Sequence, residues 1–101
     1  MVNDGGDYDQ WYFADMAMDV INGKIPYGVL PGNHDQPTDL FNRYFGFERF
    51  YGDDWYGGHY GNTNDNNFQL VSTGSIDFIF MQLQFEPPAE VINWADGILD
   101  K

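Results

Sequence analysis

A short apolar run held between two prolines most constrains the fold of this chain. Residues 27–30 read Tyr-Gly-Val-Leu, with Pro26 before them and Pro31 after them. A wholly apolar run of this length predicts a strand that is covered on both faces, as in a parallel sheet. In open α/β sheets, ligands bind in the loops that follow the carboxyl ends of strands. The run therefore predicts an α/β fold with a candidate site in the polar segment 31–35.

Local signals predict the other elements. The first helix carries an apolar face so wide that we expect it to be buried against a sheet. Capping residues and prolines mark where the helices are expected to begin, and glycines mark where they are expected to end. Gly74-Ser75 separates two apolar runs, which is typical of a hairpin. The expected order is α-β-α-loop-β-β-α, with helices over 7–22, 38–46 and 89–99, a loop over 47–67, and hairpin strands over 68–73 and 76–85.

Composition excludes several classes of partner. Sixteen Asp and Glu residues against four Lys and Arg give a formal net charge of −12. Without a basic cluster, we expect no binding to the nucleic-acid backbone or to an anionic membrane surface. The absence of cysteine excludes disulfides and thiolate chemistry. The length predicts one domain over residues 1–101, and the first residues lack the pattern of a signal peptide.

The segment Gly32-Asn33-His34-Asp35 concentrates polar side chains directly after the apolar run. The amide oxygen of Asn33 is a hard ligand suited to a divalent metal. His34 can donate a proton to a leaving alkoxide near neutral pH. Asp35 can hold that imidazole in one orientation. The alternative interpretation is a polar turn after a strand.

This tetrapeptide after a short apolar strand resembles the calcineurin-like metallophosphoesterases. Three longer stretches, residues 5–13, 41–58 and 65–95, are similar to a secreted or surface-associated bacterial branch of that superfamily. The resemblance thus covers nearly the whole chain. A four-residue motif alone is a weak signal, so these longer stretches carry most of the resemblance.

The resemblance implies a four-layer α/β/β/α sandwich and an extracellular or periplasmic protein. It also implies two bridged divalent ions, Mn, Fe or Zn, that hydrolyse phosphomonoesters or phosphodiesters. At the matching positions, it makes Asn33 a metal ligand and His34 the group that stabilises or protonates the leaving group. It makes Asp35 the acidic partner of that histidine.

The chain also departs from the family pattern. It has no Asp-x-His on an early strand and no Gly-His-x-His near its end. Residues 1–3 resemble the last positions of a Gly-Asp-x-x-Asn motif, whose metal-bridging Asp would precede Met1. We therefore expect an internal fragment of a phosphoesterase that is inactive alone and binds no stoichiometric pair of metal ions.

Four other features have a functional and a plain interpretation. His59 could face substrate or lie in a loop, and we do not assign it to the metal. The Asn-rich segment 62–68 does not match the EF-hand pattern, so its two remaining interpretations are an adventitious cation site and a turn before a strand. The aromatic segment 53–61 could line a pocket or pack under a loop. The acidic segment 3–9 is expected to be a loop with a helix cap.

Two further functions remain open beside the phosphoesterase fragment. The chain could be a non-catalytic remnant of the fold that binds or self-associates through exposed strand edges. It could also be an acidic binding module with a single weak cation site, in which the surplus carboxylates serve bound cations rather than solubility alone.

Overall fold

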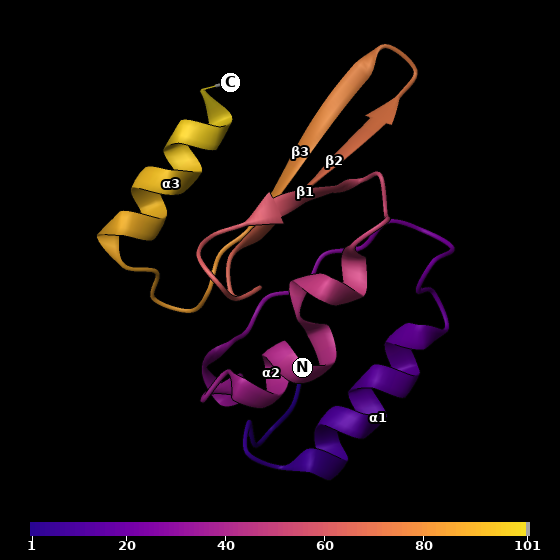
Figure 1. The fold of residues 1–101 in the computed structure, drawn as a ribbon, viewed down its shortest axis with the longest axis vertical. Coiled ribbons are helices and arrows are strands. Elements are labelled where there is room, and N and C mark those ends of the chain that lie inside the picture. The colour runs from indigo at the N-terminus through magenta and orange to yellow at the C-terminus, as the bar shows by residue number, and fades with distance from the viewer. Residues whose placement is uncertain (101) are drawn as a thin grey trace.

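A computed structural model describes residues 1–100 and shows a mixed α/β fold. The helices α1 and α2 lie at one end, and the sheet projects from the other end with α3 beside it (Figure 1). Within the described residues the elements are α1 (Tyr8–Asp19), the 3-10 helix η1 (Asn33–Asp35), α2 (Asp39–Phe45), the 3-10 helix η2 (Phe47–Phe50), β1 (Tyr56–His59), β2 (Asn67–Thr73), β3 (Ile76–Gln82) and α3 (Ala89–Leu99).

The sheet is antiparallel throughout, with the strand order β1-β2-β3. Strands β2 and β3 form the expected hairpin, in which Val71 faces Phe78. Gly74 makes the turn with a φ of +62°, a conformation that glycine adopts without the strain of a Cβ. The hairpin and the three helices are therefore confirmed, with bounds close to those expected.

The expected strand over 27–30 is wrong. Among residues 1–100, that segment has no regular secondary structure and forms no ladder with another strand. Neither flanking proline has a backbone N–H, and the Val29 carbonyl accepts a hydrogen bond from the Asn67 side chain at 2.8 Å. The strand that completes the sheet is β1, which lies inside the expected loop 47–67, so the expected parallel sheet is also wrong.

An aromatic core joins the two N-terminal helices. Trp11 on α1 is fully buried, with its ring centroid 5.9 Å from that of Phe41 and 6.1 Å from that of Phe45 on α2. The expected burial of α1 against a sheet is wrong, because α1 packs on α2 instead. Its wider apolar face stays in solvent, with Phe13 65% and Val20 66% exposed.

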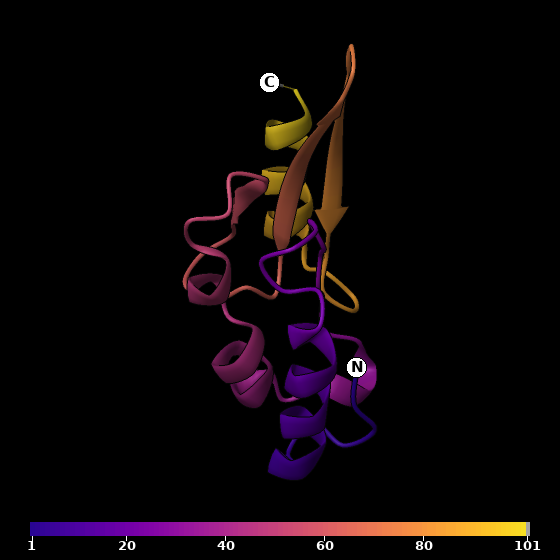
Figure 2. The same cartoon turned by 90° about the vertical axis from the view of Figure 1, so that its right-hand side faces the viewer.

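The described chain is thin for its width. Its principal extents are 41, 34 and 18 Å, and a side view shows the flat arrangement (Figure 2). Stacked sheets lie about 10 Å apart before any covering helices are added, and this chain has a single sheet among residues 1–100. The fold is therefore mixed α/β, with a single antiparallel sheet in residues 1–100, and the four-layer sandwich that the resemblance implies is not part of this description. None of the helices in residues 1–100 is both long and apolar enough to cross a bilayer.

Candidate functional site

The tetrapeptide 32–35 folds into a tight turn with its functional side chains outward. The Asp35 backbone N–H donates to the Gly32 carbonyl at 3.2 Å, and the Gly32 N–H donates to the Asp35 carboxylate at 2.9 Å. These two bonds close the short helix η1. Asn33 and His34 are exposed, whereas Asp35 is buried with 1% of its surface accessible. The turn therefore presents the two expected reactive groups to solvent.

The buried carboxylate of Asp35 binds backbone groups rather than the imidazole. It accepts hydrogen bonds from the amino nitrogen of Met1 at 3.1 Å, from the N–H of Val2 at 2.8 Å and from the Gly32 N–H described above. Within residues 1–100 it makes no hydrogen bond to His34. The expected role of Asp35 as the partner that orients His34 is therefore replaced by that of an anchor for the N-terminal segment.

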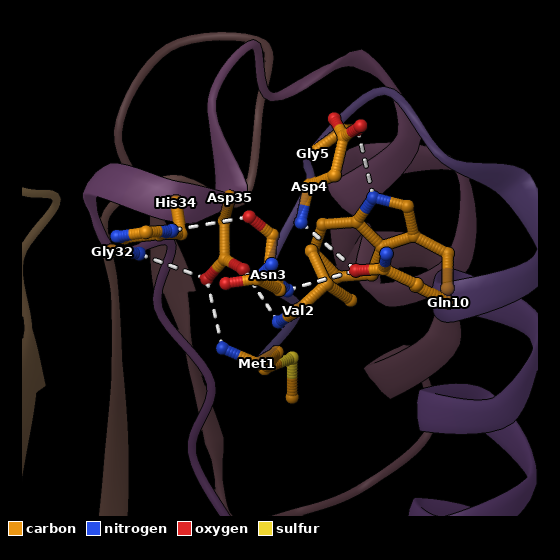
Figure 3. A network of polar contacts seen from close by, with 10 residues as sticks. Met1, Val2, Asn3, Asp4, Gly5, Gln10, Gly32, His34 and Asp35 are labelled. Carbon is orange, nitrogen blue, oxygen red and sulfur yellow. Dashed lines mark hydrogen bonds and ion pairs between the residues drawn. The ribbon is translucent and has the colours of Figure 1, made fainter.

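His34 instead contacts a backbone carbonyl from the start of the chain. Its Nδ1 lies 3.1 Å from the carbonyl oxygen of Asn3, 31 positions earlier (Figure 3). A carbonyl oxygen only accepts, so this contact requires the proton on Nδ1 and leaves Nε2 without it in the neutral ring. The Asn33 side chain makes no hydrogen bond within the described residues. The structure thus brings the carbonyl of Asn3 beside His34 and leaves the neighbouring Asn33 side chain exposed.

Helix α1 fixes the loop that carries Asn3. The Gln10 side-chain oxygen accepts hydrogen bonds from the N–H groups of Asn3 and Asp4, each at 2.8 Å. The indole N–H of Trp11 donates to the Gly5 carbonyl at 2.9 Å. Sequence reasoning assigned neither residue to the site, because their partners lie six or seven positions earlier in an irregular loop whose course no periodic pattern predicts. The acidic segment 3–9 forms the expected cap, with the Asp7 carboxylate accepting from the Asp9 N–H.

The described residues do not form a two-metal centre by themselves. Among residues 1–100, no group of three or more His, Cys, Asp or Glu side chains is arranged to hold a metal ion. Asn33 could supply one oxygen ligand, which is too few for a bridged pair of ions. The donor set of residues 1–100 therefore does not fit a dinuclear metal site without further residues.

His59 belongs to the packing rather than to the turn at 32–35. It ends β1, and its ring stacks on Phe47 with centroids 4.0 Å apart and an interplanar angle of 7°. Its Nδ1 is buried and has no hydrogen-bond partner in the described part of the chain. No hydrogen bond links it to Asn33 or His34.

The Asn-rich segment is a buried structural network. The Asn64 side chain donates to the Phe45 carbonyl and accepts from the Tyr56 hydroxyl, at 2.8 and 2.6 Å. The Asn67 amide donates to the carbonyls of Val29 and Asn64, each at 2.8 Å. Because these amides are occupied by internal partners, the segment ties the sheet to α2 and favours the turn interpretation over a cation site.

The aromatic segment 53–61 packs inward. The ring centroid of Phe50 lies 5.8 Å from that of Trp55 and 5.4 Å from that of Tyr56. Burial raises the pKa of the Tyr56 phenol, because the charged phenolate would lose its hydration. This geometry matches aromatic packing under a loop more closely than an open substrate pocket.

Arg49 forms a polar hub that sequence reasoning also missed. Its guanidinium contacts the Asp15 carboxylate, donates to Asp19 at 3.0 Å and to the Tyr27 hydroxyl at 2.7 Å, and lies over the Phe45 ring. Burial alone would lower the pKa of Arg49, but its hydrogen bonds and carboxylate neighbours raise it overall. Burial raises the pKa of Tyr27, partly offset by Arg49. The hub joins α1, η2 and the 26–31 segment.

Comparison with known proteins gives one informative similarity. The chain is 37% identical over 107 aligned residues to YvnB, an uncharacterised protein of Bacillus subtilis (strain 168). The alignment takes in 100% of this chain but 8% of the relative, so the chain spans a small part of that protein's length. No family model matches the chain, and no solved structure matches it.

Proposed function

We propose that this chain is one part of a dinuclear-metal-dependent phosphoesterase that hydrolyses phosphomonoesters or phosphodiesters. In this proposal Asn33 supplies one metal ligand, and His34 stabilises or protonates the leaving group. The metal-bridging carboxylate and the remaining histidine ligands come from outside residues 1–101. The isolated chain is then inactive, because it lacks most of the ligands of the two Mn, Fe or Zn ions.

One observation carries the proposal. Asn3 and His34 are 31 positions apart, yet the Asn3 carbonyl meets the His34 ring at 3.1 Å. The resemblance assigns both segments to a single metal site, since residues 1–3 match the end of the motif that supplies the bridging carboxylate. A ligand placed just before Met1 would enter the structure beside Asp35, because the Met1 nitrogen lies 3.1 Å from that carboxylate.

The finer features of the family remain part of this proposal. They are the four-layer α/β/β/α sandwich, the two-metal hydrolytic chemistry and an extracellular or periplasmic location. Strand β3 supports the first of these, since exposed apolar side chains lie on both of its faces: Ile76, Phe78 and Phe80 on one, and Ile79 on the other, which also carries the exposed Asp77 at the hairpin end. A strand that is apolar on both faces is typical of an interior strand with covering layers.

Metal content tests the proposal. We would exchange the matching segment of YvnB for this chain and compare the resulting full-length protein with the isolated chain after dialysis against Mn²⁺-free buffer. We expect about two tightly held divalent ions per molecule in the full-length protein and no stoichiometric metal in the isolated chain. Two tightly held ions in the isolated chain, or none in a folded full-length protein, would contradict the proposal.

A second candidate function is non-catalytic self-association, and the free edge of β3 favours it. Strand β3 pairs with β2 on one side and has no strand on its other side within residues 1–100. An apolar, unpaired edge strand is a template for pairing with another chain. Light scattering over a range of concentrations separates the two candidates, since a monomeric isolated chain would remove the support for assembly.

A further inference from the structure

Gln10 connects helix α1 to the loop beside His34. Its side-chain oxygen receives two backbone N–H groups, those of Asn3 and Asp4, each at 2.8 Å. Its amide nitrogen donates to the Asp7 carboxylate at 3.2 Å. Two donors on one side and a carboxylate on the other leave a single satisfactory orientation for this amide.

The orientation of Gln10 sets the direction of the Asn3 peptide. The Asp4 N–H and the Asn3 carbonyl belong to one planar trans peptide unit and point in opposite directions. The bond from the Asp4 N–H to Gln10 therefore turns the Asn3 carbonyl oxygen toward Nδ1 of His34 (Figure 3). Gly5 continues the loop and is held by the Trp11 indole. The loop thus takes its position from the first turn of a helix whose Trp11 is fully buried in the core.

We infer that Gln10 is a positioning residue for His34. By holding the peptide unit between Asn3 and Asp4, it keeps an acceptor opposite Nδ1, so that the neutral ring carries its proton on Nδ1 and leaves Nε2 without one. In the proposed reaction, Nε2 would then donate a proton to the leaving group only from the imidazolium form of the ring. This inference rests on the proposed function for its catalytic meaning. The tautomer it describes is a property of the metal-free chain and can be measured without any activity.

Two variants separate positioning from general stability. Gln10→Met keeps the length and helix propensity of the side chain but removes the acceptor for Asn3 and Asp4. In the double variant Asp7→Asn, Gln10→Glu, the side chain at position 10 still accepts from the N–H groups of Asn3 and Asp4. The hydrogen bond between positions 7 and 10 is kept with its direction reversed, because the Asn amide now donates to the Glu carboxylate, and Asn remains a good helix cap. Met16→Ala, at an exposed position of the same helix, is the matched control.

The readout is the tautomer of neutral His34, observed by ¹⁵N NMR of the isolated chain under mildly alkaline conditions. With two histidines in the chain, a His34→Gln variant identifies which signals belong to His34. We expect Nδ1–H to dominate in the parent chain and in the double variant. In Gln10→Met the ratio of Nδ1–H to Nε2–H should fall about five-fold, as loss of one ordinary hydrogen bond allows.

An unchanged tautomer ratio in folded Gln10→Met would overturn the inference, as would a parent chain in which Nε2–H dominates. If Gln10→Met does not fold, amide exchange in the parent chain decides. Slow exchange of the N–H groups of both Asn3 and Asp4 supports their hydrogen bonds to Gln10, and free exchange of either contradicts the inference.

The outcome also separates this inference from the proposed function. The expected tautomer result, together with no hydrolysis by the full-length protein, would reject the proposed function and leave Gln10 as a positioning residue for His34.

Discussion

The backbone N–H of Val2 donates a 2.8 Å hydrogen bond to the buried carboxylate of Asp35, 33 positions later. The same carboxylate closes the turn that exposes Asn33 and His34. One buried side chain therefore joins the start of the chain to the candidate site. Loss of the Asp35 carboxylate should therefore destabilise both the N-terminal residues and the turn at 32–35.

Asp35→Asn should lower the free energy of unfolding by about 1–3 kcal/mol. The variant keeps the shape of the side chain but replaces one acceptor with a donor that faces the backbone N–H groups of Val2 or Gly32. Urea unfolding followed by tryptophan fluorescence measures the change. Asp54→Asn, at an exposed position, is the control and should shift stability by less than about 0.5 kcal/mol.

Gly5→Ala should destabilise the chain by about 1–3 kcal/mol or more. A Cβ at Gly5 would lie 2.4 Å from the carbonyl oxygen of Gln36, so the backbone at one of the two sites has to move. At the neighbouring Gly6, the nearest atom would be an Asp4 side-chain oxygen at an ordinary 3.5 Å. Equal thermal midpoints for Gly5→Ala and Gly6→Ala would show that the loop does not pack against residues 35–36 as described.

Arg49→Lys should cost about 2 kcal/mol, because an ammonium cannot reproduce the planar fork that reaches Asp15, Asp19 and Tyr27. Arg43→Lys is the matched control, since Arg43 is exposed and lies over the Tyr8 ring without an ion pair among residues 1–100. We expect the control to cost less than about 1 kcal/mol. Denaturant midpoints for both variants check the prediction, which fails if the two substitutions cost the same.

Stability should fall as the pH rises above about 10, the ordinary value for tyrosine. Burial raises the pKa of Tyr27 and of Tyr56 in the folded chain, so the native state holds these protons more tightly than the unfolded state does. Their contribution is complete below the unfolded pKa and is lost as the pH approaches the folded pKa. Unfolding free energies over an alkaline pH series should decline less steeply in Tyr56→Phe. An equally steep decline in folded Tyr56→Phe would contradict the prediction.

Local signals were sufficient to predict most of the elements. The Asp7 cap and the Pro88 start lie next to their helices, and Gly74 lies in its turn, so nearby residues set these bounds. The run 27–30 misled because an apolar segment between prolines indicates burial but not a hydrogen-bonded neighbour. Strand β1 reads Tyr-Gly-Gly-His, which has no alternating pattern, and it forms because β2 offers a partner.

The candidate site was predictable only in part. Sequence reasoning identified Asn33 and His34 as a polar pair, and the structure leaves both exposed on one turn. The contact of His34 with Asn3 and the clamp by Gln10 join positions that lie far apart or on different elements. The first contact spans 31 positions, and the contacts of Gln10 depend on the course of the irregular loop before α1, so neither follows a periodic pattern in the sequence.

The most direct test of the central claim is phosphate-ester hydrolysis by YvnB that carries this chain in place of its matching segment, with and without His34→Gln. We expect Mn²⁺-dependent cleavage of aryl phosphomonoesters or diesters, and a fall in kcat of about 100-fold or more in the variant. His59→Gln, which alters the ring stacked on Phe47, is the control and should retain the parent rate when folded. A folded His34→Gln protein that cleaves as fast as its parent, or a folded parent that cleaves neither ester, would contradict the account.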